Sequence, residues 1–289
     1  MPADLFAQAL NGLAYGVLLF LLSVGLTLIF GILGVINLAH GSFFMIGAYL
    51  AHWLALKTGN LFIAIALGLP LSFLLGLAVE RLAIGFLYAR DHLYQVLLTY
   101  GLILIFNELQ RILWGNDVHG VPIPAMLDAP VPLNDTQSYP LYRFFISLAC
   151  IGVAAAMYLV IHRTKLGMLI RAGAANREMV ELLGFGVKRL YALVFALGAA
   201  LTAFAGMLSA PVNSVYPGMG EHILIISFVV VVIGGLGSIQ GAFVGAMLIG
   251  FVDTFGKVFL PEAASLSVYA FMAAVLLWRP QGLFGARPA

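Results

Sequence analysis

The stretch GVINLAHGSFFMIGAYLAHW, residues 34–53, begins with two glycines, an asparagine, a histidine and a serine, and apolar sequence lies on both sides of this group. Two structures would account for it. In a hairpin between two helices, Asn37 and His40 would only satisfy backbone groups. In a membrane helix interrupted within the bilayer, the same side chains would line a pathway, because irregular backbone at that depth needs protein or water around it.

The composition of the 289-residue chain indicates a membrane protein. The chain is 63% hydrophobic and 9% charged, with a mean hydropathy of +1.07, whereas globular domains carry about 25% charged residues. A surface so poor in charge cannot face water all round, so lipid is the expected solvent. No basic stripe with interleaved aromatic residues occurs, so no nucleic-acid partner is expected. The single cysteine, Cys150, excludes an internal disulfide and a cysteine metal cluster.

Apolar segments along the chain predict an all-α fold, a polytopic integral membrane helical bundle. A spanning helix needs roughly 20 apolar residues, because the hydrocarbon core is about 30 Å thick. The apolar stretches lie at 5–33, 42–56, 60–79, 93–113, 141–161, 190–210, 222–237, 239–259 and 264–278. Two of them, 42–56 and 222–237, are short. We therefore expect residues 1–289 to form a single transmembrane domain of about eight to nine helices, some of them Gly-interrupted or half-length.

The charges of two loops predict the orientation of this bundle. Residues 162–189 contain six Lys or Arg and two Glu, whereas residues 114–140 contain three Asp and neither Lys nor Arg. Loops rich in Lys and Arg stay in the cytoplasm. We therefore expect a cytoplasmic loop at 163–190 and an outer loop at 114–140. The outer loop is rich in proline, which predicts ordered but irregular structure.

A second glycine-rich interruption occurs late in the chain, in VIGGLGSIQGAFVGAMLIG, residues 232–250. It can be laid over the first, Gly34 on Gly237 and Gly41 on Gly241, with a three-residue gap. Paired interruptions of this kind indicate discontinuous helices at a transport pathway. In this interpretation Ser42 caps a helix over 43–56, whose N-terminus suits a carboxylate or amide oxygen. The predicted pathway residues are Asn37, His40, Gly41, Ser42, Gly237, Gln240 and Gly241.

Charged residues within or beside the spans are expected to pair locally, because an isolated ionisable group in a membrane is costly. Spacing predicts ion pairs of Glu108 with Arg111 and of Asp253 with Lys257. Glu80 and Arg81, at the inner end of a span, are expected to be interfacial anchors or to pair with another helix.

The informative soluble segment is RTKLGMLIRAGAANREMVELLGFGVKRL, residues 163–190. Within it, 174–183 is predicted to form a short amphipathic helix, whose apolar residues are Met179, Val180, Leu182 and Leu183 and which Gly184 and Gly186 end. Such a helix outside the bilayer is either a solvated connector or a docking element. No nucleotide-binding motif of the type G-x-x-x-x-G-K-[ST], no hydrolase or kinase signature and no zinc motif occurs in the chain. We therefore expect neither an enzyme nor a bound cofactor.

Three stretches together resemble the permease subunits of bacterial ABC importers of the branched-chain amino acid type. They are GLTLIFGILGVINLAHGSFFMIGAYLA at 25–51, TKLGMLIRAGAANREMVELLGFGV at 164–187 and VVIGGLGSIQGAFVGAMLIG at 231–250. Their order and spacing fit that family, and the resemblance covers essentially the whole chain.

The resemblance implies a division of labour among several proteins in the bacterial inner membrane. Residues 171–184 look like the coupling helix, which fits a groove in a cytoplasmic ATPase subunit. Two such ATPase subunits would bind the ATP. A second permease, a paralogue rather than an identical copy, would complete the pathway, and a periplasmic substrate-binding protein would deliver substrate. The implied coupling residues are Arg171, Ala172, Asn176, Arg177, Glu178, Met179, Leu183 and Gly184.

Other functions remain open at this stage. Branched-chain amino acids, namely leucine, isoleucine and valine, are the leading substrates, but relatives of this kind carry urea, short amides, aromatic acids or other amino acids. A secondary transporter or a passive channel would also use Gly-broken helices. Dependence of transport on an ATPase separates these classes, since a secondary transporter or channel needs none.

Overall fold

The computed structural model describes residues 2–88, 90–134 and 137–285, without the side chains of residues 2–4, 134, 137 and 177. In chain order its elements are α1 (Pro2–Leu33), α2 (His40–Thr58), α3 (Leu61–Leu82), η1 (Ile84–Leu87), α4 (His92–Trp114), η2 (Ala125–Leu127), β1 (Pro130–Asn134), β2 (Gln137–Pro140), α5 (Leu141–Arg163), α6 (Lys165–Ala175), α7 (Arg177–Leu182), α8 (Val187–Asn213), α9 (Met219–Gly234), α10 (Ile239–Phe259), η3 (Pro261–Ala263) and α11 (Ala264–Trp278).

Long apolar helices dominate the described part of the chain, which confirms the polytopic helical fold. Seven helical segments there are long and apolar enough to cross a membrane: 5–33, 61–87, 92–114, 141–163, 187–213, 239–259 and 261–278. The predicted count of eight to nine also included the two short segments. The structure has helices in both places, but α9 is only 16 residues long and α2 is not among the seven.

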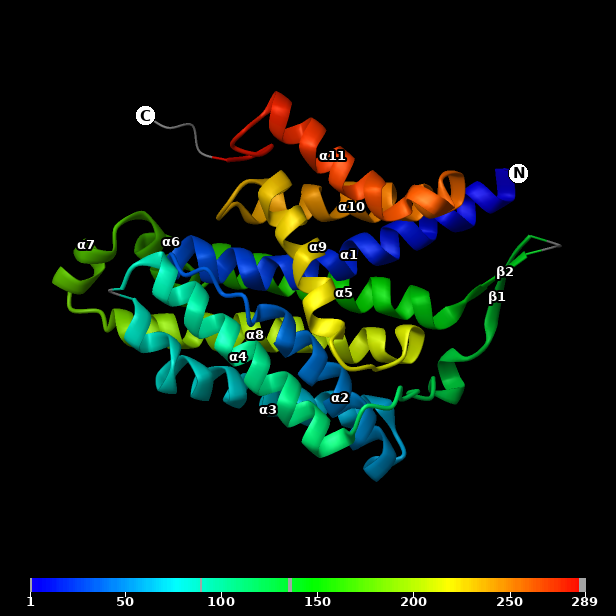
Figure 1. Cartoon of the computed structure of the whole chain (residues 1–289), viewed down its shortest axis with the longest axis horizontal. Coiled ribbons are helices and arrows are strands. Elements are labelled where there is room, and N and C mark those ends of the chain that lie inside the picture. Colours follow the sequence, from blue (N-terminus) through cyan, green and yellow to red (C-terminus); the bar gives the residue numbers. More distant parts are fainter. Residues whose placement is uncertain (1, 89, 135–136, 286–289) are drawn as a thin grey trace.

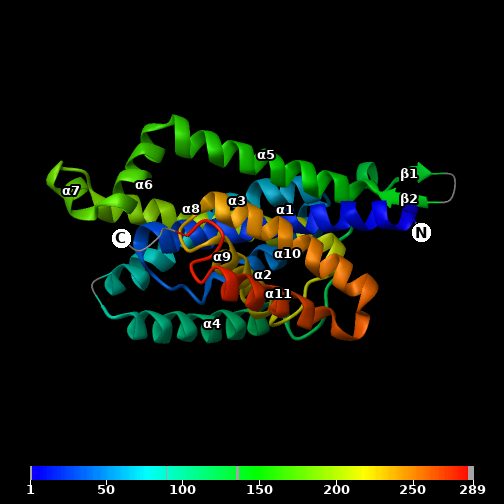
Figure 2. The same cartoon turned by 90° about the horizontal axis from the view of Figure 1, so that it is seen from above.

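The bundle is elongated, with helices α1 and α8 in its middle (Figures 1 and 2). Helices α4 and α5 run along opposite sides in Figure 2. Helices α6 and α7 project from one end, hereafter the α7 end, and β1 and β2 form the other, the hairpin end. Helix α1 starts at the hairpin end, so the N-terminal helix begins on the same side as the predicted outer loop.

Glycine and alanine let the central helices approach closely. A Cβ atom at Gly47 of α2 would overlap the backbone of Ala203 in α8, and one at Gly206 of α8 would overlap the carbonyl of Phe44. Small residues at both surfaces allow backbones to touch, which is the usual way that helices associate within membranes.

The interruption at residues 34–39 carries the chain back into the bundle. Gly34 has φ +64°, a left-handed conformation that glycine adopts without strain, and ends α1. Helix α2 then starts at His40, whose ring contacts the carbonyl of Leu22, well inside the span of α1. A Cβ at Gly41 would overlap the carbonyl oxygen of Gly220, in the first turn of α9. The two short helices therefore begin side by side in the interior of the bundle.

The predicted cap at Ser42 is wrong. Helix α2 begins two residues earlier, with Ala39 at the N-cap position and no capping hydrogen bond from its side chain. The turn at Asn37–His40 already starts the helix, so Ser42 lies inside its first turn. The second interruption does use a serine: Ser238 accepts a hydrogen bond from the backbone N–H of Gly241 at 3.0 Å. Helix α9 ends at Gly234, three residues before the predicted boundary, because Gly235 has φ +101°.

Two further sequence predictions need correction. The predicted helix over 174–183 is split, because Asn176 adopts an extended conformation and accepts a hydrogen bond from the N–H of Met179 at 3.0 Å, which caps α7. The outer loop 114–140 is not wholly irregular, since β1 and β2 pair in antiparallel register with Val131 opposite Tyr139. Its prolines fit because each strand of a two-stranded sheet is an edge strand.

Candidate functional site

His40 is the centre of a buried polar contact between three helices. Its Nε2 atom lies 3.1 Å from the carbonyl oxygen of Leu22 in α1 and 2.6 Å from Oγ1 of Thr202 in α8. The Thr202 hydroxyl donates its hydrogen to the carbonyl of Gly198 at 2.9 Å. Since both neighbours of Nε2 then act as acceptors, the proton of the imidazole belongs on Nε2. His40 therefore fixes the start of α2 against α1 and α8.

Asn37, in the extended link before α2, is completely buried. Neither polar atom of its amide has a hydrogen-bond partner among the described residues. An unsatisfied buried amide costs about 1–3 kcal/mol of folding free energy. A buried polar group without a partner calls for a physical reason. One such reason is that the segment changes its packing during function.

Gln95 of α4 holds the same link, and the sequence offered no signal for it. Its Oε1 accepts a hydrogen bond from the backbone N–H of Ile36 at 3.4 Å and lies 3.1 Å from Nδ1 of His92. Its Nε2 donates to the carbonyls of Leu87 and Arg90, at 3.4 Å each. This glutamine therefore ties the interruption to the α7 end of α4.

The structure separates the predicted pathway residues into two groups. Asn37, His40, Gly41 and Ser42 lie together, buried between α1, α8 and α9. Gly237, Gln240 and Gly241 lie at the other end of α9, where a Cβ at Gly241 would overlap the Gly234 backbone. Gln240 lines an apolar cavity of about 320 Å³ with Phe20, Tyr158, His162 and Phe243, among others.

The segment 165–185 forms a separate structural feature at the α7 end. Thr164 caps α6 by accepting from the N–H of Gly167 at 3.1 Å, and the Arg171 guanidinium donates to the carbonyl of Ile161. Gly184, with φ +81°, turns the chain after α7 towards α8. The Arg177 side chain lies outside the described residues.

Part of the exposed surface of this segment is apolar, around the end of α7. Met179 is 53% exposed, Leu182 82% and Leu183 67%, and Phe185 beside them is also exposed. Ala172, Asn176 and Glu178 are exposed as well. Val180 was expected on the same face but is 3% exposed and packs into the core with Ile170 and Val187. Large exposed apolar patches on a segment that leaves the bundle mark an interaction surface.

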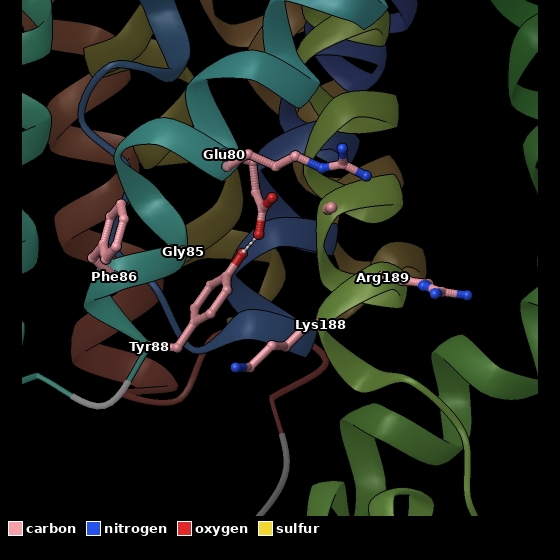
Figure 3. Close-up of a pocket in the computed structure, with 8 residues that line it drawn as sticks. Glu80, Gly85, Phe86, Tyr88, Lys188 and Arg189 are labelled. Atoms are coloured by element: carbon pink, nitrogen blue, oxygen red, sulfur yellow. Dashed lines mark hydrogen bonds between the residues drawn. The ribbon is translucent and has the colours of Figure 1, made fainter.

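Beside this segment, η1 and α8 enclose a basic hollow of about 320 Å³ (Figure 3). The Tyr88 hydroxyl points at Glu80 and donates to its carboxylate at 2.6 Å. Glu80 is therefore buried and pairs with Tyr88 at the end of η1, so of its two predicted roles the interfacial anchor is wrong. Arg81, Lys188 and Arg189 line the hollow, which makes this end of the molecule positive.

The charged pairs predicted from spacing are confirmed. Glu108 and Arg111 approach to 2.6 Å, and so do Asp253 and Lys257. The structure adds one contact that spacing could not reveal: Nδ2 of Asn107 donates to Oε1 of Glu221 at 2.6 Å, across 114 residues of sequence.

Comparison with known proteins identifies the family. The family described as "Branched-chain amino acid transport system / permease component" matches residues 8–278. The chain belongs to this permease family. It is 30% identical to the high-affinity branched-chain amino acid transport system permease protein BraD of Pseudomonas aeruginosa, over 96% of this chain and 95% of BraD. It is 26% identical to LivH of Escherichia coli K12, over 96% of this chain and 94% of LivH.

A relative of a second kind also matches this permease. LivM of Escherichia coli K12, another high-affinity branched-chain amino acid transport system permease protein, is 28% identical over 91% of this chain and 67% of LivM. No solved structure matches. The family match runs from within α1 to the end of α11, so it includes the α6–α7 segment and both short helices. The chain is thus a multi-pass membrane permease subunit and not itself an enzyme.

Proposed function

We propose that this permease is the transmembrane subunit of an ATP-driven importer in the bacterial inner membrane, and that it passes leucine, isoleucine and valine. The observation that carries the proposal is the exposed apolar face of α7 on a segment that leaves the bundle, in a chain whose family transports branched-chain amino acids. A secondary transporter or a channel has no use for such a docking element.

The α7 face would seat a cytoplasmic ATPase subunit, and two such subunits would bind the ATP that this chain has no motif to bind. Met179 and Leu183 supply apolar anchors, and Arg171 and Glu178 stand at the rim. A second permease, a paralogue of the LivM kind, would complete the pathway. A periplasmic substrate-binding protein would dock at the hairpin end.

The link 34–39 and the start of α2 would form the moving part of the pathway. The buried Asn37 amide has no hydrogen-bond partner among the described residues, and one nitrogen of His40 alone anchors the start of α2 to α1 and α8; both observations favour a segment with a second arrangement. Conformational coupling of this kind requires that the nucleotide state of the ATPase bias the two arrangements. The second group of predicted pathway residues would act where α9 ends and α10 begins, at the α7 end of the bundle. This group consists of Gly237, Gln240 and Gly241.

Reconstitution into proteoliposomes tests the function directly. We expect leucine uptake that requires ATP, the ATPase subunits and the cognate binding protein, and that excess isoleucine or valine inhibits. Uptake that persists without the ATPases would instead show a secondary transporter or a channel. Uptake inhibited by urea or an aromatic acid, and not by isoleucine, would reassign the substrate.

Thiol labelling of intact cells tests the orientation. A cysteine replacing Asp128, which is exposed at the hairpin end, should react with an impermeant reagent added outside. A cysteine replacing Glu178 of α7 should react only after permeabilisation, because the Lys and Arg residues around it hold that end in the cytoplasm. The native Cys150 is buried and contributes little background. The reverse pattern of labelling would invert the proposed topology.

A further inference from the structure

Glu221 lies at about the middle depth of the helical bundle, although its sequence position, one span beyond the expected cytoplasmic loop 163–190, suggests an outer loop. It lies in the first turn of α9, next to Gly220, which packs against Gly41 at the start of α2. The start of α2 in turn contacts Leu22, which is 11 residues from the end of the α1 span at Leu33. Eleven residues of helix measure about 16 Å, roughly half of the hydrocarbon thickness.

The charge of Glu221 is not neutralised within the described part of the chain. Asn107, which donates to its Oε1, is neutral. Among the described residues, no Lys or Arg forms an ion pair with Glu221 and its Oε2 has no hydrogen-bond partner. The residue is exposed on the surface of this chain. A carboxylate at this depth costs about 2.5–3.5 kcal/mol when it faces lipid, so this surface faces water or another protein.

The surroundings of Glu221 combine one fixed carboxylate with apolar side chains. Ile225, one turn further along α9, is 50% exposed, and Leu104 is exposed on α4, one turn before Asn107. Asn107 fixes one oxygen of the carboxylate and leaves the other available. A branched-chain amino acid has the complementary chemistry, a charged ammonium group beside an aliphatic side chain.

We propose that Glu221, positioned by Asn107, is a substrate-contacting residue of the translocation pathway, where it attracts the α-ammonium group of the amino acid. This inference rests on the proposed function. The site is half of a pathway, and the second permease closes it opposite α4 and α9. Helix α4 lies at the edge of this chain, as such a position requires (Figure 2).

Charge-selective thiol labelling tests this site without relying on transport. The assembled complex would carry Ile225→Cys with Cys150→Ala, and it would be treated with the cationic reagent MTSET or the anionic reagent MTSES. A unit charge about 7 Å away across water changes the two reaction rates in opposite directions, so we expect the ratio of the two rates, divided by their ratio for a free thiol, to favour the cation about five- to tenfold. Glu221→Gln should bring this ratio to about one. The matched control Glu108→Gln, whose carboxylate is paired with Arg111, should retain it.

Transport gives the second readout. Glu221→Gln should raise KM for leucine about tenfold while the ATPase subunits remain bound, whereas Glu108→Gln should stay within twofold of the parent. If Glu221→Gln fails to assemble, Glu221→Asp, which keeps the charge, should retain the labelling ratio.

Three results would overturn the inference. The first is a cysteine at position 225 that does not react in the assembled complex, either without nucleotide or with ATP trapped. That result would place the surface around Glu221 in a sealed interface or in lipid. Labelling without charge preference would remove the electrostatic role, and an unchanged KM in Glu221→Gln would remove the contact with substrate. Failure of the parent complex to transport leucine would contradict the proposed function alone, because the labelling ratio is measured without substrate.

Discussion

Replacing Met179 and Leu183 together with aspartate is expected to release the ATPase subunits from the purified complex and to stop ATP-driven uptake. Both side chains are more than half exposed, on a helix that leaves the bundle. Two apolar anchors at a protein interface contribute about 2 kcal/mol each, and a loss of about 4 kcal/mol weakens binding about a thousandfold. Co-purification of the ATPases from detergent and uptake into proteoliposomes would measure the two effects.

The matched control uses exposed apolar residues at the opposite end. Val118 and Met126 are exposed near the hairpin end, and their replacement by aspartate should leave the ATPases bound. Met179 and Leu183 have no role in the core, so the double variant should insert into the membrane in normal amounts. ATPases retained at parental levels, together with normal uptake, would show that α7 is a solvated connector and not the coupling element.

Gly41→Ala is expected to destroy the fold, although it adds only one methyl group. That group would overlap the carbonyl oxygen of Gly220 and approach Cβ of Leu224 to 2.8 Å. The obstacle is backbone, so no side-chain rotation relieves it, and the two short helices must separate. An extra methylene in a well-packed core costs about 1–3 kcal/mol when side chains and backbone can shift to accommodate it. We expect a larger loss here, seen as a fall in monodisperse protein after detergent extraction and in its Tm.

A glycine with open space supplies the control. A Cβ at Gly101 of α4 meets no atom within 4 Å, and this position lies in a regular helix. Gly101→Ala should therefore fold normally and gain a little stability, because alanine has the higher helix propensity. A normal yield and Tm for Gly41→Ala would mean that α2 and α9 do not begin in contact.

The local features of this protein could be predicted from the sequence. The long apolar runs predicted the seven spanning segments, since a helix that satisfies its own backbone is the stable form of such a run in lipid. The ion pairs of Glu108 with Arg111 and of Asp253 with Lys257 followed from spacing on one helix. Gly184 was expected to end the α7 segment, and its φ of +81° provides that turn.

Features that depend on contacts between distant segments needed the tertiary structure. Helix α2 begins at His40 and not after Ser42, because Leu22 and Thr202 hold the imidazole there. Val180 is buried because α7 folds back on the chain's own core, which periodicity over six residues cannot reveal.

The depth of Glu221 in the bundle is the clearest example of a feature that depends on contacts between distant segments. In the sequence, Glu221 comes soon after the connection between α8 and α9, which is expected outside the membrane. Its sequence position therefore predicts a place near the membrane surface. The backbone contact between Gly41 and Gly220 brings its helix to the middle of the bundle, next to Asn107 on α4. Hydropathy and spacing describe each helix by itself, whereas the depth at which a short helix starts depends on how closely two distant glycines let backbones approach. The sequence alone therefore determined the seven long apolar segments, and packing decided where the two short helices lie and which polar groups meet inside the bundle.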